Sequence, residues 1–195
     1  MSRIHAGLPD YLAPGLSILF VGINPGLRSS EVGHHYAGPS NRFWKLLYEA
    51  KLVPERLTCQ DDGRLLTFGY GLTNLIAKTT AGTRDLTEQD FLQGREALLA
   101  KITRYQPAIV AVLGMSVARV LWDHEDLVSS GQDKPKERIL PGFQSRSLAG
   151  VPVCVLPNPS GRNAHYSYHV MTNLFVELKN VSLKLSQGQA NQTCS

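Results

Sequence analysis

Residues 16–26, LSILFVGINPG, join a short apolar run to a turn that contains two glycines and a proline. Apolar residues that are partly β-branched and end at Gly and Pro are typical of a buried strand followed by a sharp turn. This arrangement places Asn24 at the edge of the predicted sheet, where its amide is able to position a water molecule. Taken alone, the pentapeptide GINPG is more typical of an ordinary tight turn.

Outside this segment, short apolar runs alternate with helical patterns, which predicts a parallel sheet covered by helices on both faces. The expected fold is therefore a three-layer α/β/α sandwich with a central, mostly parallel sheet. The pattern predicts strands at 17–21, 71–76, 108–113 and 151–156, and helices that open at Pro39 and Ser40, after the capping-box-like 87–90, at 116–122 and at 166–183. The polar stretch 123–142 is interpreted as a surface loop with room for one short strand.

Length and composition limit the functional classes. The chain has 195 residues and a formal charge of +4, which suits one domain with a full core and a polyanionic partner without requiring one. Its three cysteines form no Cys-x-x-Cys pair, so a disulfide framework and a four-thiolate cluster are not indicated. The N-terminus lacks a signal-peptide core and no apolar run is long enough for a bilayer, so we expect an intracellular protein without a membrane partner. A dinucleotide site is disfavoured because GINPG lacks the G-x-G-x-x-G pattern.

Two further segments carry chemistry: HHYAGPSNRFWK at 34–45, and VPVCVLPNPSGR at 151–162. Together with GINPG they resemble the mismatch-specific uracil/thymine DNA glycosylases, a branch of the uracil-DNA glycosylase superfamily. The resemblance extends through 71–76, Thr79-Thr80 and 105–107, and covers residues 12–178. It implies a uracil-DNA glycosylase-like fold, a glycosylase domain at 12–184, an N-terminal arm at 1–11 and a disordered tail at 185–195.

The resemblance also implies the reaction. Such an enzyme flips a base out of DNA and hydrolyses its N-glycosidic bond, here uracil, thymine or a modified pyrimidine opposite guanine, and leaves an abasic site. The oxocarbenium-like transition state is strongly electrophilic and needs a well-placed water more than a strong base. In the family, the residue that matches Asn24 positions this water, so Asn24 is the expected catalytic residue.

The base pocket implied by the resemblance combines turn backbone, polar side chains and an aromatic ring. Tyr36 matches the family's stacking position, and Asn74 matches the amide that faces the base. Ordinary core or loop packing is an open alternative for Tyr36, as is capping of the strand end for Asn74. For His35, Asn41 and Thr80 a structural or capping role is an open alternative. The full expected set is Gly22, Ile23, Ser29, His35, Tyr36, Asn41, Asn74 and Thr80.

Ser29 departs from the family pattern, because the animal thymine glycosylases carry alanine at the matching position. A hydroxyl adds bulk and polarity where the 5-methyl group of thymine would lie. We therefore expect uracil to fit more easily than thymine.

The loop after the last predicted strand resembles the family's DNA insertion loop, in which Gly161 allows close approach to the duplex and Arg162 enters the stack. The expected insertion and guanine contacts are Asn158, Pro159, Ser160, Gly161 and Arg162. A surface loop with a solvated arginine is the structural alternative. Phosphate contacts are expected from Arg28, Arg42, Lys45, Lys78 and Arg84.

The sequence thus predicts a monomeric, monofunctional glycosylase that acts on double-stranded DNA with G:U or G:T mismatches, with no metal or organic cofactor. A lyase would need an amine nucleophile, and no lysine falls in the water-positioning motif. Two alternatives stay open. One is a DNA-binding protein of the same fold that recognises mismatches or modified bases without cutting, and the other is an unrelated small-molecule hydrolase. The expected location is the cytoplasm or nucleoid of a bacterium, or the nucleus of a eukaryote.

Overall fold

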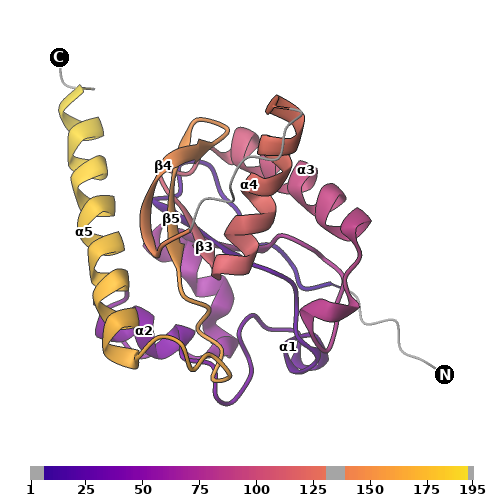
Figure 1. Cartoon of the computed structure of the whole chain (residues 1–195). Helices are drawn as coiled ribbons and strands as arrows, with labels where there is room; N and C mark the ends of the chain where they lie inside the picture. Colours follow the sequence, from indigo (N-terminus) through magenta and orange to yellow (C-terminus); the bar gives the residue numbers. More distant parts are fainter. Residues whose placement is uncertain (1–6, 131–138, 193–195) are drawn as a thin grey trace.

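The computed structural model describes residues 7–130 and 139–192, with side chains at 7–122 and 139–188 (Figure 1). Within these residues the chain forms one five-stranded sheet in the order β2-β1-β3-β5-β4. The strands are β1 (Ile18–Gly22), β2 (Tyr70–Asn74), β3 (Val110–Leu113), β4 (Gly142–Leu148) and β5 (Val151–Leu156). Only β4, at one edge, runs antiparallel to its neighbour β5, so the expected mostly parallel sheet is confirmed.

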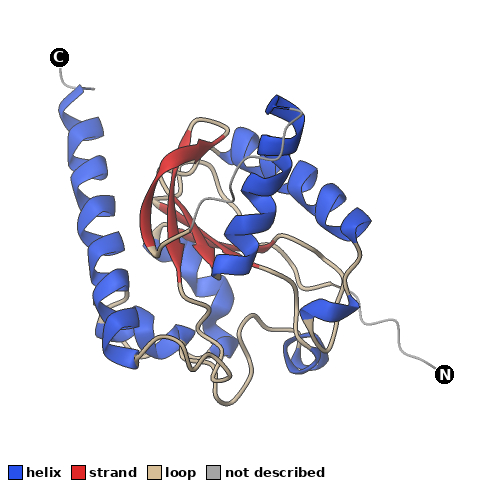
Figure 2. Ribbon diagram, in the orientation of Figure 1, coloured by secondary structure: helices blue, strands red, loops and turns tan. Residues whose placement is uncertain are grey.

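Helices cover both faces of the sheet (Figure 2). One face packs against α2 (Phe43–Glu49) and α5 (Tyr168–Gln192), and the other against α3 (Glu88–Tyr105) and α4 (Met115–Ser130). A short helix, α1 (Leu27–Val32), follows the turn after β1, and 3₁₀ segments occur at Cys59–Phe68 and Thr83–Asp85. The three-layer α/β/α sandwich is therefore the observed architecture.

Two separate cores follow from the alternation of side chains along the strands. In β1, Ile18 and Phe20 belong to the core under α2 and α5, whereas Leu19 and Val21 belong to the core under α3 and α4. Both faces of β1 are fully buried. This is why the strand is apolar throughout instead of alternating with polar residues.

Several element boundaries differ from the expectation. Helix α2 begins at Phe43 and not at Pro39, because Asn41 Oδ1 accepts the Phe43 N–H at 3.0 Å and the preceding residues form a separate turn. Helix α4 continues to Ser130, since no Gly or Pro interrupts the chain before Gly131. Residues 123–130 of the predicted loop 123–142 are therefore helical, residues 131–138 lie outside the described residues, and β4 begins only at Gly142, where the predicted loop ends.

The described residues near both chain ends contact the rest of the protein. Tyr11 pairs with Leu72 of β2 in an isolated bridge, and Asp10 forms an ion pair with Lys101 of α3 at 2.7 Å. Helix α5 continues to Gln192, so 185–192 are helical where we expected disorder; Leu185 packs against the core on this helix. Residues 1–6 and 193–195 lie outside the described residues. None of the described helices is both long and apolar enough to cross a membrane.

The strand register brings the chemical segments together. Gly22 at the end of β1 pairs with Asn74 at the end of β2. Because β1, β2, β3 and β5 are parallel, the loops that follow them leave from the same edge of the sheet, where ligands bind in open α/β sheets. In Figure 1 this edge lies at the bottom, where α1 and the loop from β5 to α5 are found.

Candidate active site

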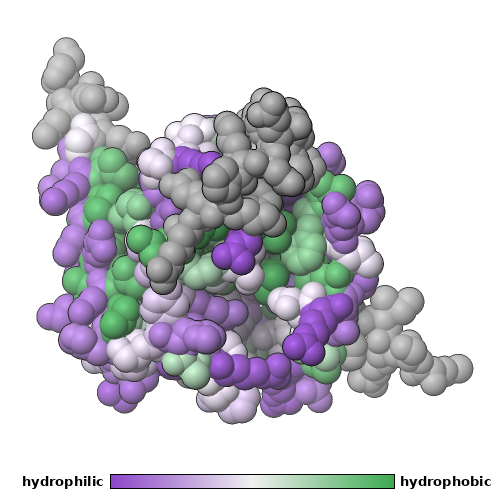
Figure 3. All heavy atoms as spheres, in the orientation of Figure 1, coloured by the Kyte–Doolittle hydropathy of each residue, from purple (hydrophilic) through white to green (hydrophobic). Residues whose placement is uncertain are grey.

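A cleft of about 510 Å³ opens at this carboxyl edge. In Figure 3 hydrophilic residues dominate the corresponding lower rim of the molecule. The cleft brings together every base-pocket and insertion residue expected from the sequence: Gly22, Ile23, Asn24, Ser29, His35, Tyr36, Asn41, Asn74, Thr80, and 158–162. Segments more than a hundred residues apart in the chain therefore meet in one place.

Asn24 is held by its amide nitrogen. Nδ2 donates to Pro25 O at 3.2 Å, to Lys78 O at 3.1 Å and to Thr80 Oγ1 at 2.8 Å. Since backbone carbonyls only accept hydrogen bonds, the atom between them must be the nitrogen, and the orientation of the amide is fixed. Among the described residues the side-chain oxygen has no hydrogen-bond partner, so it is able to accept a hydrogen bond from a molecule in the cleft.

Thr80 serves this arrangement directly. Its buried hydroxyl donates to Gly82 O at 2.8 Å and thereby turns a lone pair toward Asn24 Nδ2. The backbone of this segment is tied to the turn as well, because Thr80 N donates to Pro25 O at 3.2 Å. Thr80 lines the cleft as expected, but the hydrogen bonds of its hydroxyl are directed to Gly82 and Asn24.

His35 has a structural set of contacts. Its side chain is 1% exposed, its ring Nε2 lies 2.9 Å from Pro9 O, and its backbone N–H donates to Asp62 Oδ2 at 3.0 Å. Burial lowers the pKa of His35, so the ring is neutral, and Nε2 carries the proton because Pro9 O only accepts. Both N–H groups are thus committed within the protein, and His35 supports the loop beside the cleft.

Asp62 is the centre of that support. Its buried carboxylate accepts from Tyr11 Oη at 2.9 Å, from His35 N, and from Gly63 N at 2.9 Å. His34 Nδ1 lies 3.2 Å from the same carboxylate. Burial and the hydrogen bond to Asp62 raise the pKa of Tyr11 to about 12. The carboxylate thus fixes the His34-His35 backbone that leads into Tyr36.

Tyr36 is built rigidly into the wall of the cleft. Its ring lies 4.2 Å from the Phe43 ring, centroid to centroid, at an interplanar angle of 33°. Its backbone adopts the left-handed region with φ 53°, which is uncommon for a non-glycine residue. Its hydroxyl is buried without a hydrogen-bond partner among the described residues, and burial raises the pKa of the phenol. The phenol is therefore neutral, and its hydroxyl is an unsatisfied polar group inside the wall of the cleft.

Gly22 keeps the floor of the cleft open. A Cβ at this position would lie 2.6 Å from Asn74 Oδ1 and 3.0 Å from the Tyr36 hydroxyl oxygen. The amide of Asn74 and the phenol of Tyr36 therefore share one small space, directly beside the turn that carries Asn24. The glycine is required by this close approach.

Ser29 and Asn41 combine a cleft position with local hydrogen bonds. Ser29 Oγ accepts the Ala37 N–H at 3.1 Å, which ties α1 to the loop after His35. Asn41 Oδ1 accepts the Phe43 N–H at the start of α2, which agrees with the capping role given above as the alternative for this residue. In both residues the oxygen is an acceptor for the backbone, and the hydroxyl hydrogen of Ser29 and the amide nitrogen of Asn41 are left for contacts in the cleft.

The 158–163 loop forms a compact, internally bonded unit. Asn158 Oδ1 accepts from Ser160 N at 2.9 Å, Ser160 Oγ accepts from Arg162 N at 3.3 Å, and Asn163 Nδ2 donates to Asn158 O at 2.9 Å. A Cβ on Gly161 would lie 2.5 Å from Ser40 Cβ and 2.7 Å from Ser40 O. The absence of a side chain at Gly161 is therefore required inside the protein, by the approach of this loop to Ser40.

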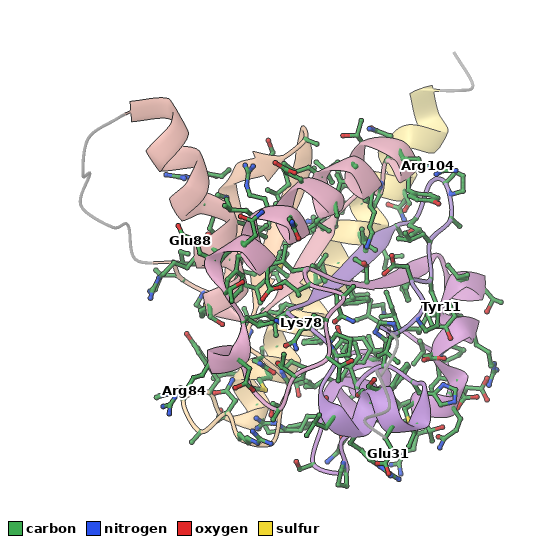
Figure 4. The ribbon with its side chains drawn as sticks, turned by 90° about the vertical axis from the view of Figure 1, so that its right-hand side faces the viewer. Tyr11, Glu31, Lys78, Arg84, Glu88 and Arg104 are labelled. Carbon is green, nitrogen blue, oxygen red and sulfur yellow. The ribbon has the colours of Figure 1, made fainter. Side chains whose placement is uncertain are left out.

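The expected phosphate contacts behave differently from one another. Arg28, Lys45 and Lys78 pair with Glu31, Glu49 and Asp90 on the surface, and such exposed pairs contribute little stability and separate easily. Figure 4 shows Lys78 and Arg84 on the face that also carries Glu31 of α1. Arg162 is exposed at the rim of the cleft, and its guanidinium has no hydrogen-bond partner among the described side chains and backbone groups. Arg42 instead hydrogen-bonds to the 158–163 loop.

Sequence reasoning missed Asp62, Asn163 and the carbonyl of Lys78. A buried Asp within a polar run, QDDGR, gives no signal of its own, and a backbone carbonyl leaves no trace in residue identity. Asn163 directly follows the expected insertion residues. Because Asn side chains often bond to the backbone of turns, its position in the sequence was a usable signal. Among the described residues, no three His, Cys, Asp or Glu side chains cluster as metal ligands would.

Comparisons with known proteins agree with this geometry. Residues 9–179 match the family model "Uracil DNA glycosylase superfamily". The fold is similar to the solution NMR structure of a "putative Uracil DNA glycosylase" from Methanosarcina acetivorans, at 19% sequence identity and a TM-score of 0.51, over 90% of this chain and 98% of that chain. The protein belongs to the uracil-DNA glycosylase superfamily.

Proposed function

We propose that the protein is a monofunctional DNA glycosylase that removes uracil opposite guanine by direct hydrolysis, with a water positioned by Asn24. The observation that carries the proposal is the fixed amide of Asn24, whose nitrogen is held by three acceptors while its oxygen has no partner within the described part of the chain. Membership of the superfamily supports a DNA substrate and base excision.

The cleft supplies the other parts that this reaction needs. The Tyr36 ring, backed by Phe43, offers a rigid surface on which a flipped pyrimidine stacks, and the Asn74 amide lies beside it to read the edge of the base. Arg162 projects from a bonded loop at the rim, where it would fill the space left in the DNA stack. The bond between C1′ and N1 breaks and uracil leaves as an anion. The water oxygen bonds to C1′, and the proton that this water loses passes to solvent or to the uracil anion, which yields the abasic site and free uracil.

An amide oxygen orients water but does not take its proton at neutral pH. We therefore expect a slow enzyme whose rate depends on the leaving group, so that bases with more acidic N1 positions are released faster. An excision assay on a duplex with one G:U pair tests the proposal, and thymine and modified pyrimidines in the same duplex give the substrate range. Binding without base release would favour the alternative, a non-catalytic protein that recognises mismatched or modified DNA.

Thr80→Val should slow uracil release about five- to tenfold, the effect of one lost hydrogen bond on the orientation of Asn24. Valine keeps the shape of threonine but offers no acceptor to Asn24 Nδ2, now 2.8 Å away. Single-turnover kinetics on a G:U duplex measure the rate. The matched control is Thr79→Val, which removes a neighbouring hydroxyl whose hydrogen bond goes to Ser30 Oγ at 3.0 Å and not to Asn24. Equal losses in the two variants would argue against a support role for Thr80.

Ser29→Ala should raise thymine excision relative to uracil excision by about 1–3 kcal/mol, the usual effect of a methyl-sized change in a pocket. The hydroxyl lies on the cleft side of α1, and its removal frees space for a 5-methyl group. The ratio of rates on G:T and G:U duplexes isolates this effect, because loss of the bond to Ala37 N affects both substrates alike. An unchanged ratio would show that another group excludes thymine.

A further inference from the structure

The side chain of Arg42 links the start of α2 to the 158–163 loop. Nη2 donates to Ser160 O at 2.8 Å and to Asn163 O at 2.9 Å, and Nε lies 3.5 Å from Pro159 O. The backbone N–H of Arg42 also donates to Pro159 O at 2.9 Å. Two segments separated by more than a hundred residues are thus joined through a single residue.

These contacts engage the guanidinium of Arg42 within the protein. Both hydrogens on Nη2 are used, and the three acceptors are carbonyl oxygens of one loop, those of Pro159, Ser160 and Asn163. Hydrogen bonds from a charged donor are stronger than neutral ones, and the planar fork of arginine matches several acceptors at once. A lysine has the same charge but one nitrogen, so it does not span the same carbonyls.

A second, independent contact seats the same loop. Gly161 approaches Ser40 so closely that a Cβ would lie 2.5 Å from Ser40 Oγ. Asn163 closes the loop from the other side, since its N–H donates to Ser160 O at 3.0 Å and its amide donates to Asn158 O at 2.9 Å. The loop is therefore ordered on both flanks of Arg162 before any partner is present.

We propose that Arg42 is a positioning residue that holds the 158–163 loop in the conformation from which Arg162 enters the DNA stack. The proposal rests on the proposed function, because it concerns insertion into DNA. A loop ordered in advance loses less conformational entropy when it inserts, so the flipped state becomes more populated. Arg42 acts through Arg162 and does not touch the reacting atoms.

Hydrogen exchange in the free protein tests whether Arg42 holds the 158–163 loop in place, without any measurement of activity. In Arg42→Lys the amides of Arg162 and Asn163 should exchange at least about tenfold faster, because the loop opens more often, whereas amides of β1 should be unchanged. The control is Arg104→Lys; Arg104 lies at the end of α3, at the opposite end of the molecule from α1 (Figure 4). Unchanged exchange at both amides would overturn the proposal.

Excision kinetics test whether the held loop favours insertion of Arg162 into the DNA stack. Arg42→Lys should slow uracil release from a G:U duplex about ten- to a hundredfold, since stronger, charge-assisted bonds are lost, and should change release from single-stranded DNA less than about threefold. In an Arg162→Ala background the same substitution should have almost no further effect on the duplex rate. Losses that multiply in the double variant would show that Arg42 is an independent phosphate contact. If the unmodified protein released no uracil, the proposed function would fail, and the exchange experiment would still decide the positioning role.

Discussion

Asn24→Ala should reduce uracil release from a G:U duplex by about 100-fold or more, because the reacting water loses the group that orients it and a misplacement of about 1 Å alone costs about 10²-fold. The amide oxygen faces the cleft only because Pro25 O, Lys78 O and Thr80 Oγ1 fix the nitrogen. Alanine removes both the oxygen and the fixed orientation. Affinity for the duplex should change little, since phosphate contacts supply most of the binding energy and the water is needed chiefly in the transition state.

Single-turnover rates and binding isotherms on the same oligonucleotide separate the two effects. Asn180→Ala, an exposed residue of α5, is the matched control, and thermal unfolding of both variants checks that the fold is kept. Near-normal uracil release by Asn24→Ala would refute the catalytic assignment. A parallel loss of duplex affinity would place Asn24 in DNA binding instead.

Arg162→Ala should slow uracil release from a paired duplex about a hundredfold and leave release from single-stranded DNA within about threefold of the original rate, because unstacking a base costs a few kcal/mol only where a stack exists. The guanidinium is exposed at the rim of the cleft, while the Arg162 backbone N–H donates to Ser160 Oγ at 3.3 Å. Truncation therefore removes the inserting group and leaves the loop bonded. The water held by Asn24 is untouched.

A fluorescent base analogue next to the target position reports flipping separately from bond cleavage. We expect the flipped population to fall in Arg162→Ala by the same factor as the duplex rate. An equal loss on duplex and single strand would instead assign Arg162 to phosphate binding, and unchanged flipping would assign the insertion role to another residue.

The central sheet was predictable because both of its faces are buried. A strand such as β1, with Ile18, Phe20 and Leu19 in two different cores, has to be apolar throughout, and such runs stand out in a sequence. The edge strand β4 was not predicted, since its four consecutive polar residues at 144–147 do not alternate with apolar ones. Its pairing with β5 is a tertiary contact that local pattern does not reveal.

The gathering of the candidate residues in one cleft was predictable, whereas several of their contacts were not. Motif resemblance selected residues that all line one cleft, because the carboxyl ends of parallel strands share one edge. It did not reveal that His35 donates its N–H groups to Pro9 and Asp62. It also did not reveal the hydrogen bonds from Arg42 to the 158–163 loop. The charge of Arg42 is visible in the sequence and suggested a phosphate contact, whereas the carbonyls of a distant loop are not visible there.

The most direct measurement is the product of incubating the unmodified protein with a duplex that contains a single G:U pair. We predict free uracil in amounts equal to the abasic sites formed, and strand breakage only after alkaline treatment, as expected for hydrolysis without a lyase step. Tight binding to the G:U duplex with no free uracil at any enzyme excess would contradict the account.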